Sequence, residues 1–313
     1  MIPLSIRSQI TLFLCLGLVA LGEARLTHST KKAFQLILDP IHTATFAFYI
    51  IFGVTTAFQT LSAFFKSVSA LRKLGRREQA TAGGRDYSTG SIYVHLVFLG
   101  ACSALVYDVL STVWIVYTQN QFVTRVVPDA FMAGKFLVQE SADLFICFAM
   151  LALLYHRQRI AYGPKADELR PYRYKLFLDA ALLASYLALI IVYASLRSVY
   201  SSSDSIRNAY YQLLTADRVV IGLFSVLAIN VTASSVYAWL RLKRISPPDA
   251  AMVGQIVKFI SPLLLVRAIF KIVEYVLLYN QISIISQHEL DSIRLARAIV
   301  MGLTYFVILI YAL

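Results

Sequence analysis

Charged residues within long apolar segments are the groups of this chain that could do chemistry. They occur in four separate apolar stretches, at Asp108, at Lys135, Glu140 and Asp143, at Arg267, Lys271 and Glu274, and at Arg294 and Arg297. A charge at the centre of a lipid-embedded helix costs at least about 2.5 kcal/mol, so such groups normally face a partner or a water-filled cavity. Ion pairing between helices, or binding of a polar ligand, is the chemistry that they predict.

Helical spacing places several of these groups on shared faces. Arg267, Lys271 and Glu274 follow an i, i+4, i+7 pattern, and Glu140 and Asp143 an i, i+3 pattern. Two carboxylates so close in an apolar setting favour a cation between them. We therefore expect Arg267 to approach Glu140 or Asp143.

A second, more outward cluster is expected from the remaining groups, with Asp108 lying between the two clusters. Its predicted members are Lys135, Lys271, Glu274 and Arg297. Two interpretations are open: a static ion network that holds helices in register, or a network that lines an outward-opening pocket for a polar or amphipathic ligand.

Composition shows which elements must position these residues. Of the 313 residues, 58% are hydrophobic and 15% charged, against about 25% charged in soluble domains. This excludes a soluble, disordered or disulfide-rich protein. Seven stretches are long enough to cross a bilayer as helices, namely 41–65, 92–117, 130–155, 176–196, 219–240, 256–279 and 293–313. The predicted fold is an all-α, polytopic bundle of seven transmembrane helices.

Loop charges predict the orientation. Most loop Lys and Arg residues follow the first, third and fifth spans, which places those loops and the C-terminus in the cytoplasm and the N-terminus outside. The net charge of +12 then reflects basic loops against anionic membrane lipids, so no nucleic-acid partner is expected. The alternative use of these loops is to bind a cytoplasmic protein.

The N-terminus resembles a targeting segment. Residues 1–24 contain a short apolar run followed by small residues, the pattern of a cleaved signal peptide, with an uncleaved anchor as the alternative. Residues 25–40 would then form a short lumenal or extracellular segment, and 41–313 the transmembrane domain. The expected location is the plasma membrane or an endomembrane of the secretory pathway.

The sequence lacks the residues that several kinds of active site require. The last span has no lysine for a retinal Schiff base, the five histidines do not gather for a zinc site, and no phosphate-binding glycine loop occurs. No metal and no cofactor is expected. Carboxylate catalysis by Asp108, Glu140 or Asp143 stays open as a third function.

A family resemblance rests on the sixth span. Residues 265–275 read LVRAIFKIVEY, and Gln287, His288, Glu289 and Leu290 follow in the next loop. This is similar to the fungal seven-helix lipid-translocating exporter and drug-resistance family, although Lys271 replaces the usual Arg and the glycine expected near 277–280 is absent. The resemblance implies functional positions for Arg267, Lys271, Glu274 and Glu289, and an activity in moving lipids or tolerating toxic compounds.

Together these features predict a membrane protein that translocates or binds a lipid or amphipathic small molecule. The predicted pocket lies among the second, third, sixth and seventh helices. The alternative is a receptor that resembles G-protein-coupled receptors, although the third span ends in LLYHRQ and the seventh lacks an Asn-Pro-x-x-Tyr pattern.

Overall fold

The computed structural model describes residues 40–78, 88–119, 129–162, 170–199, 206–280 and 286–313. The predicted signal peptide and nearly all of the segment 25–40 lie outside the described residues. The described part consists of helices without any strand, which confirms the all-helical prediction.

The elements run in chain order as antiparallel rods. They are α2 (Pro40–Glu78), α3 (Ser88–Gln119), α4 (Asp129–Tyr162), α5 (Arg170–Val199), α6 (Ile206–Ile245), α7 (Pro247–Gln255), the π-helix η3 (Ile256–Ile260), α8 (Ser261–Asn280) and α9 (Gln287–Ala312). Most extend beyond the predicted spans, because their polar ends continue the helix past the apolar stretch. Six helices are long and apolar enough to cross a membrane: α2, α3, α4, α5, α6 and α9. These helices support an integral membrane protein.

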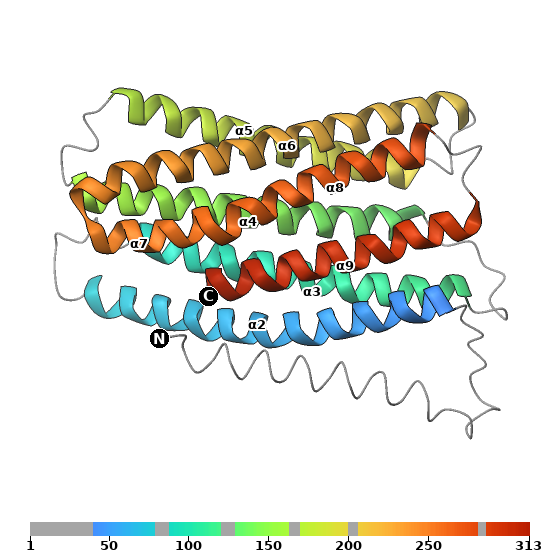
Figure 1. Ribbon diagram of the computed structural model, residues 1–313, viewed down its shortest axis with the longest axis horizontal. Helices are drawn as coiled ribbons and strands as arrows, with labels where there is room; N and C mark the ends of the chain where they lie inside the picture. Colours follow the sequence, from blue (N-terminus) through green and yellow to red (C-terminus); the bar gives the residue numbers. More distant parts are fainter. Residues whose placement is uncertain (1–39, 79–87, 120–128, 163–169, 200–205, 281–285) are drawn as a thin grey trace, which may run out of the picture.

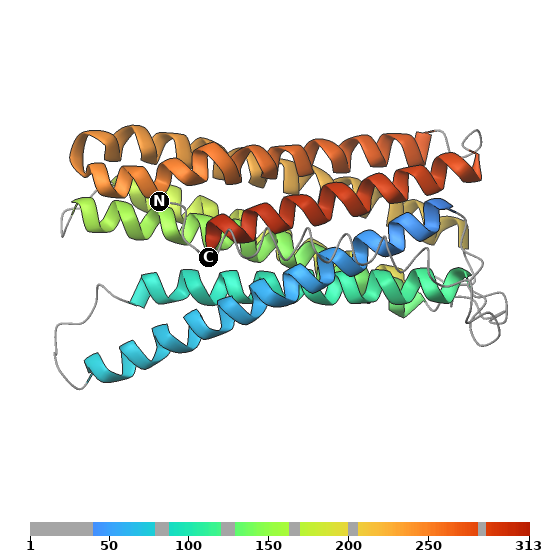
Figure 2. The same ribbon diagram turned by 60° about the horizontal axis from the view of Figure 1, so that its bottom comes forward.

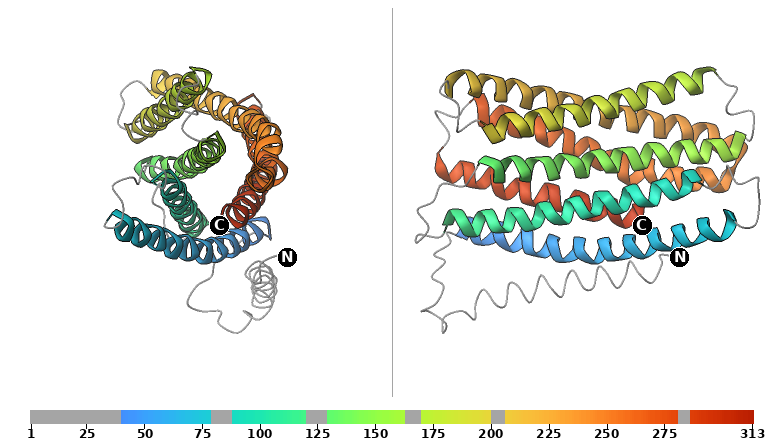
Figure 3. Two further views of the ribbon diagram at one scale, coloured as in Figure 1. Left: turned by 90° about the vertical axis from the view of Figure 1, so that its left-hand side faces the viewer. Right: turned by 180° about the vertical axis from the view of Figure 1, so that it is seen from behind.

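The helices lie side by side along the length of the molecule (Figure 1). Seen end-on, α6, α8, α9 and α2 follow one another along an arc, and α4 and α3 lie within it (Figure 3). Helix α2 crosses α3 obliquely (Figure 2). Of the six apolar helices α4 is the most buried, so its charged residues face protein and not lipid.

A wide helical turn links α7 to α8. Ser246 precedes Pro247 and Pro248, the first residues of α7, where missing backbone donors cost no helical hydrogen bond. The segment between the predicted spans 219–240 and 256–279 is also helical, because these prolines start α7 immediately after α6. Pro262 has no N–H to donate to the preceding turn. The helix widens into η3 just before this residue, where the Ser261 N–H donates to the Ile256 carbonyl.

Helices α2 and α9 approach closely at Gly302. A Cβ atom at this position would overlap the ring of Phe52, which is buried on α2. Glycine is therefore required for this contact.

We expect Gly302→Ala to lower the free energy of unfolding by about 1–3 kcal/mol, because the Phe52 ring must move within a packed interface. Thermal unfolding of the detergent-solubilised protein measures this. Gly222→Ala on α6 is the matched control, since a Cβ there meets nothing within 4 Å. Equal melting of the two variants would contradict the prediction.

Candidate functional site

Arg267 is fully buried, and both of its terminal nitrogens have partners while its Nε has none within the described residues. Its guanidinium donates to Asp143 Oδ1 at 2.5 Å, to Thr304 Oγ1 at 3.0 Å and to the Met301 carbonyl at 3.3 Å. It also lies 3.8 Å from the centre of the Tyr305 ring. The expectation that Arg267 approaches Glu140 or Asp143 is confirmed, and the partner is Asp143.

Lys271 joins the same group of charges. Its Nζ donates to both Glu140 oxygens at 2.7 and 2.6 Å and lies 2.8 Å from Asp143 Oδ2. The Tyr186 hydroxyl donates to Glu140 Oε2 at 2.5 Å. We name Glu140, Asp143, Arg267 and Lys271 the inner cluster. It holds two positive and two negative groups, all buried.

The prediction that Lys271 belongs to a separate outward cluster was therefore wrong. Helices α4 and α8 run in opposite directions (Figure 1). Lys271 lies one turn after Arg267 on α8, and Glu140 lies about one turn before Asp143 on α4. Because the two helices are antiparallel, Lys271 and Glu140 meet each other. The i, i+4 spacing on one helix and the i, i+3 spacing on the other thus match as two adjacent ion pairs.

Two of the other expected members of the outward cluster do pair. Arg297 Nη1 lies 3.4 Å from Glu274 Oε1, between α9 and α8. The Lys135 ammonium forms no ion pair among the described residues. It lies instead over three aromatic rings, 6.0 Å from the centre of Tyr49, 5.6 Å from Tyr107 and 4.6 Å from Trp114.

Asp108 and Glu289 lie apart from these groups. Asp108 is buried against α2, where the Thr56 hydroxyl donates to its Oδ2 at 3.4 Å, so it does not lie between two clusters as expected. Glu289 is exposed at the start of α9. It accepts from the Ser286 N–H at 2.8 Å and so forms a capping box. These contacts give Glu289 a local part in starting the helix.

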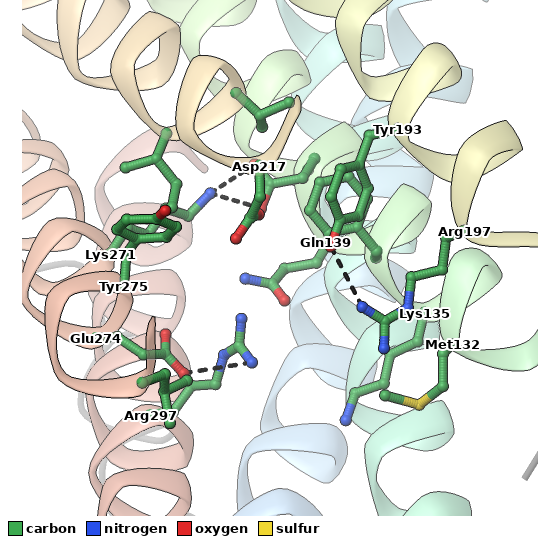
Figure 4. Close-up of a pocket in the computed structure, with 15 residues that line it drawn as sticks. Met132, Lys135, Gln139, Tyr193, Arg197, Asp217, Lys271, Glu274, Tyr275 and Arg297 are labelled. Atoms are coloured by element: carbon green, nitrogen blue, oxygen red, sulfur yellow. Dashed lines mark hydrogen bonds and ion pairs between the residues drawn. The ribbon is translucent and has the colours of Figure 1, made fainter. Parts of the chain in front are cut away.

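A cavity of about 190 Å³ opens beside the inner cluster (Figure 4). Glu140 and Lys271 form part of its wall, and Lys135, Glu274 and Arg297 also line it. Its walls come from α4, α5, α6, α8 and α9. The predicted pocket among the second, third, sixth and seventh helices is corrected accordingly: α3 does not line the cavity, whereas α5 and α6 do.

Four polar lining residues escaped the sequence analysis. They are Gln139, Tyr193, Asp217 and Tyr275. A fifth, Arg197, lies just beyond the predicted span 176–196 and extends the polar wall by donating to the Tyr193 hydroxyl at 3.4 Å. The i, i+4 spacing of Tyr193 and Arg197, and an Asp just ahead of the fifth apolar stretch, were signals that could have found them.

Gln139 is the most informative of these. Its side chain is buried, and its Nε2 has no hydrogen-bond partner. Figure 4 shows its amide extending toward the open centre, between Lys271 and Arg297. A buried amide donor without a partner costs about 1–3 kcal/mol, which a ligand or water oxygen in the cavity would offset.

A separate polar group around Asp179, by contrast, has a hydrogen-bond partner for each of its members. Asp179 on α5 accepts hydrogen bonds from Tyr155, from Lys175 and, at 2.8 Å, from Asn230 on α6. Lys175 also donates to Asn230 at 2.5 Å. This group ties α4, α5 and α6 together near the ends opposite the cavity. Asn230 thus links α6 to α5 through side-chain hydrogen bonds.

Comparison of the chain with protein-family models, with curated proteins and with solved structures finds no match. Among the described residues, no group of three or more His, Cys, Asp or Glu side chains is placed to hold a metal ion. Function must therefore be argued from the cavity and the charges around it.

We expect Arg267→Gln to destabilise the protein by about 3–5 kcal/mol, because it leaves Asp143 buried with one cation fewer. The double variant Arg267→Gln with Asp143→Asn should be less destabilised than the sum of the single variants by about 1 kcal/mol or more. Unfolding in mixed micelles measures this.

Arg244→Gln is the matched control for charge removal, because Arg244 is exposed at the end of α6. It should leave stability unchanged. Strict additivity of the two inner-cluster substitutions would contradict the pairing.

Proposed function

We propose that this chain is a seven-helix membrane protein that binds a lipid or other amphipathic small molecule in the cavity beside the inner cluster and moves it across the bilayer. The observation that carries the proposal is a polar, charged cavity, about 190 Å³ in volume, among helices that are otherwise apolar enough to lie in lipid. Charges at this depth are costly unless they are paired or serve a hydrated or ligand-binding space.

The seventh crossing in this proposal is the rod formed by α7, η3 and α8. It lies alongside α6 and α9 over most of their length (Figure 1). Within its α8 part this rod carries three charged residues, Arg267, Lys271 and Glu274, which are all buried in protein. A helix whose charges face its neighbours can cross lipid without exposing them.

The proposed orientation places the cavity in the outer half. The C-terminal ends of α2, α4 and α6 meet at one end of the bundle (Figure 1), where Arg157, Arg159, Arg241, Lys243 and Arg244 gather. Basic residues favour the cytoplasmic side. The cavity lies toward the opposite end, at the N-terminal half of α4 and the C-terminal half of α8.

An amphipathic ligand suits the mixed chemistry of the wall. Met132, Phe136 and Leu278 provide apolar surface beside the charged groups. The resemblance of the α8 sequence to lipid-translocating exporters supports the same substrate class. A receptor is the competing function, and it differs in that a bound ligand would act through a cytoplasmic partner without crossing the membrane.

We expect Ile221→Trp to slow movement of the amphiphile at least about tenfold, because the indole would fill much of the cavity. The assay uses proteoliposomes that contain fluorescent short-chain phosphatidic acid, phosphatidylcholine or a long-chain base. The rate at which dithionite bleaches label from the inner leaflet reports movement. The wild-type protein should accelerate bleaching of at least one probe over protein-free vesicles.

Ile229→Trp is the matched control on the same helix. Ile229 is 59% exposed on the outer surface of α6, so the larger side chain should be accommodated there with little effect on transport. Failure of the wild-type protein to move any probe would contradict translocation. Equal rates for the two tryptophan variants would show that the cavity is not the path.

A further inference from the structure

The charges on the cavity wall do not balance. Four lining residues are cationic and three are carboxylates: Lys135, Arg197, Lys271 and Arg297 against Glu140, Asp217 and Glu274. Behind the wall, Arg267 and Asp143 cancel each other. The cavity therefore carries one positive charge more than its wall can neutralise.

Two of these cations, Arg197 and Lys135, form no ion pair among the described residues. Arg197 donates to the Tyr193 hydroxyl, whereas Lys135 has no hydrogen-bond partner among them. The Lys135 ammonium lies over the rings of Tyr49, Tyr107 and Trp114, and no hydrogen bond or ion pair joins it to another described residue. Ring faces stabilise a cation, yet they leave its three N–H donors unused. Arg294 lies 5.0 Å from the centre of the same Trp114 ring, which brings a second cation to this ring.

The unsatisfied atoms of the wall are also donors. Gln139 Nε2 and Arg297 Nε are buried without hydrogen-bond partners. Within the described lining, no buried side-chain acceptor is left unpartnered in this way. A wall with spare donors and a spare positive charge is complementary to oxygen atoms that carry negative charge.

The volume limits how much of a ligand can enter. At about 190 Å³ the cavity is somewhat larger than an engineered cavity of about 150 Å³ that holds benzene. That space accommodates a phosphate or carboxylate with a few neighbouring atoms. An acyl chain would have to lie outside it.

We propose that the cavity binds the anionic group of an amphipathic molecule, a phosphate or a carboxylate, through the donors Lys135, Gln139 and Arg297. This inference rests on the proposed function, since it names the ligand class of the same cavity. A cationic amphiphile would meet like charge there and is excluded by the same reasoning.

Binding is tested on the full chain in nanodiscs made of zwitterionic lipid. The probes are dihexanoyl phosphatidic acid, dihexanoylglycerol as its counterpart without phosphate, inorganic phosphate, and hexyltrimethylammonium. Calorimetry should detect phosphatidic acid and give at least about tenfold weaker binding for dihexanoylglycerol and for the cation. Binding of inorganic phosphate as tight as that of phosphatidic acid would identify a free anion as the source of the same chemistry. Tighter binding of the cation or of dihexanoylglycerol overturns the inference.

Lys135→Gln should weaken phosphatidic acid about tenfold, because a charge-assisted contact is lost. The matched control is Lys258→Gln, the same substitution at an exposed lysine in η3, away from the cavity. Gln139→Leu provides a second variant that leaves the charge balance unchanged, and it should also weaken binding. Unchanged affinity in folded Lys135→Gln protein contradicts the proposal.

This test separates two kinds of failure. Binding of phosphatidic acid without movement of any probe in proteoliposomes would overturn translocation and leave the anion site in place. Movement of a long-chain base that Ile221→Trp blocks, without any binding of phosphatidic acid, would overturn the anion site alone.

Discussion

The fold depends on neutralising buried charge between helices that must also be apolar enough for a membrane. Arg267 and Lys271 on α8 face Asp143 and Glu140 on α4, in two adjacent pairs with contacts of 2.5 to 2.8 Å. Since removing one charge would leave its partner buried and unpaired, the two helices have one favourable register. Tyr305 and Thr304 bring α9 to the same point, so three helices are fixed together by one cluster.

This constraint explains why the two helices differ from the rest of the bundle. Helix α4 can carry charged residues because it is the most buried of the six apolar helices. Helix α8 can carry Arg267, Lys271 and Glu274 for the same reason, since these charges are turned toward protein. Its other face keeps apolar residues outward, with Val266 and Ile269 exposed. Burial of α4 and the charges of α8 are therefore two results of one packing arrangement.

The sequence predicts the parts of this arrangement that follow from helical periodicity. Except for the terminal Leu313, all of the predicted spans are helical in the structure. The contact between Arg267 and Asp143 follows from matching charges at matching depth. The position of Lys271 was wrong because sorting charges by depth ignores the antiparallel register of α4 and α8. The environment of Lys135 was missed because counting charges does not reveal aromatic partners on α2 and α3.

The contribution of α5 and α6 to the cavity could not be read from hydropathy. The apolar stretches that define their spans end at 196 and begin at 219, so Arg197 and Asp217 fell just outside them. In the structure α5 continues to Val199 and α6 begins at Ile206, and both residues line the cavity. A search for apolar stretches therefore omits polar residues at helix ends. These residues lie near the membrane surface, where a cavity that admits an amphiphile is expected.

The interpretations of the charges as a static network or as a pocket apply to different residues. In the inner cluster every charge has a partner, and the Asp179 group near the other end is likewise complete. Such satisfied groups rigidify packing, and there is little for a ligand to add. One turn along α4 from Glu140, Phe136 and Lys135 begin a region where donors exceed acceptors. An arrangement evolved only for stability would gain by removing Lys135 and the free amide of Gln139, because both are costly in an apolar bundle. Their presence beside a fully neutralised cluster is the strongest physical argument that the cavity serves a ligand.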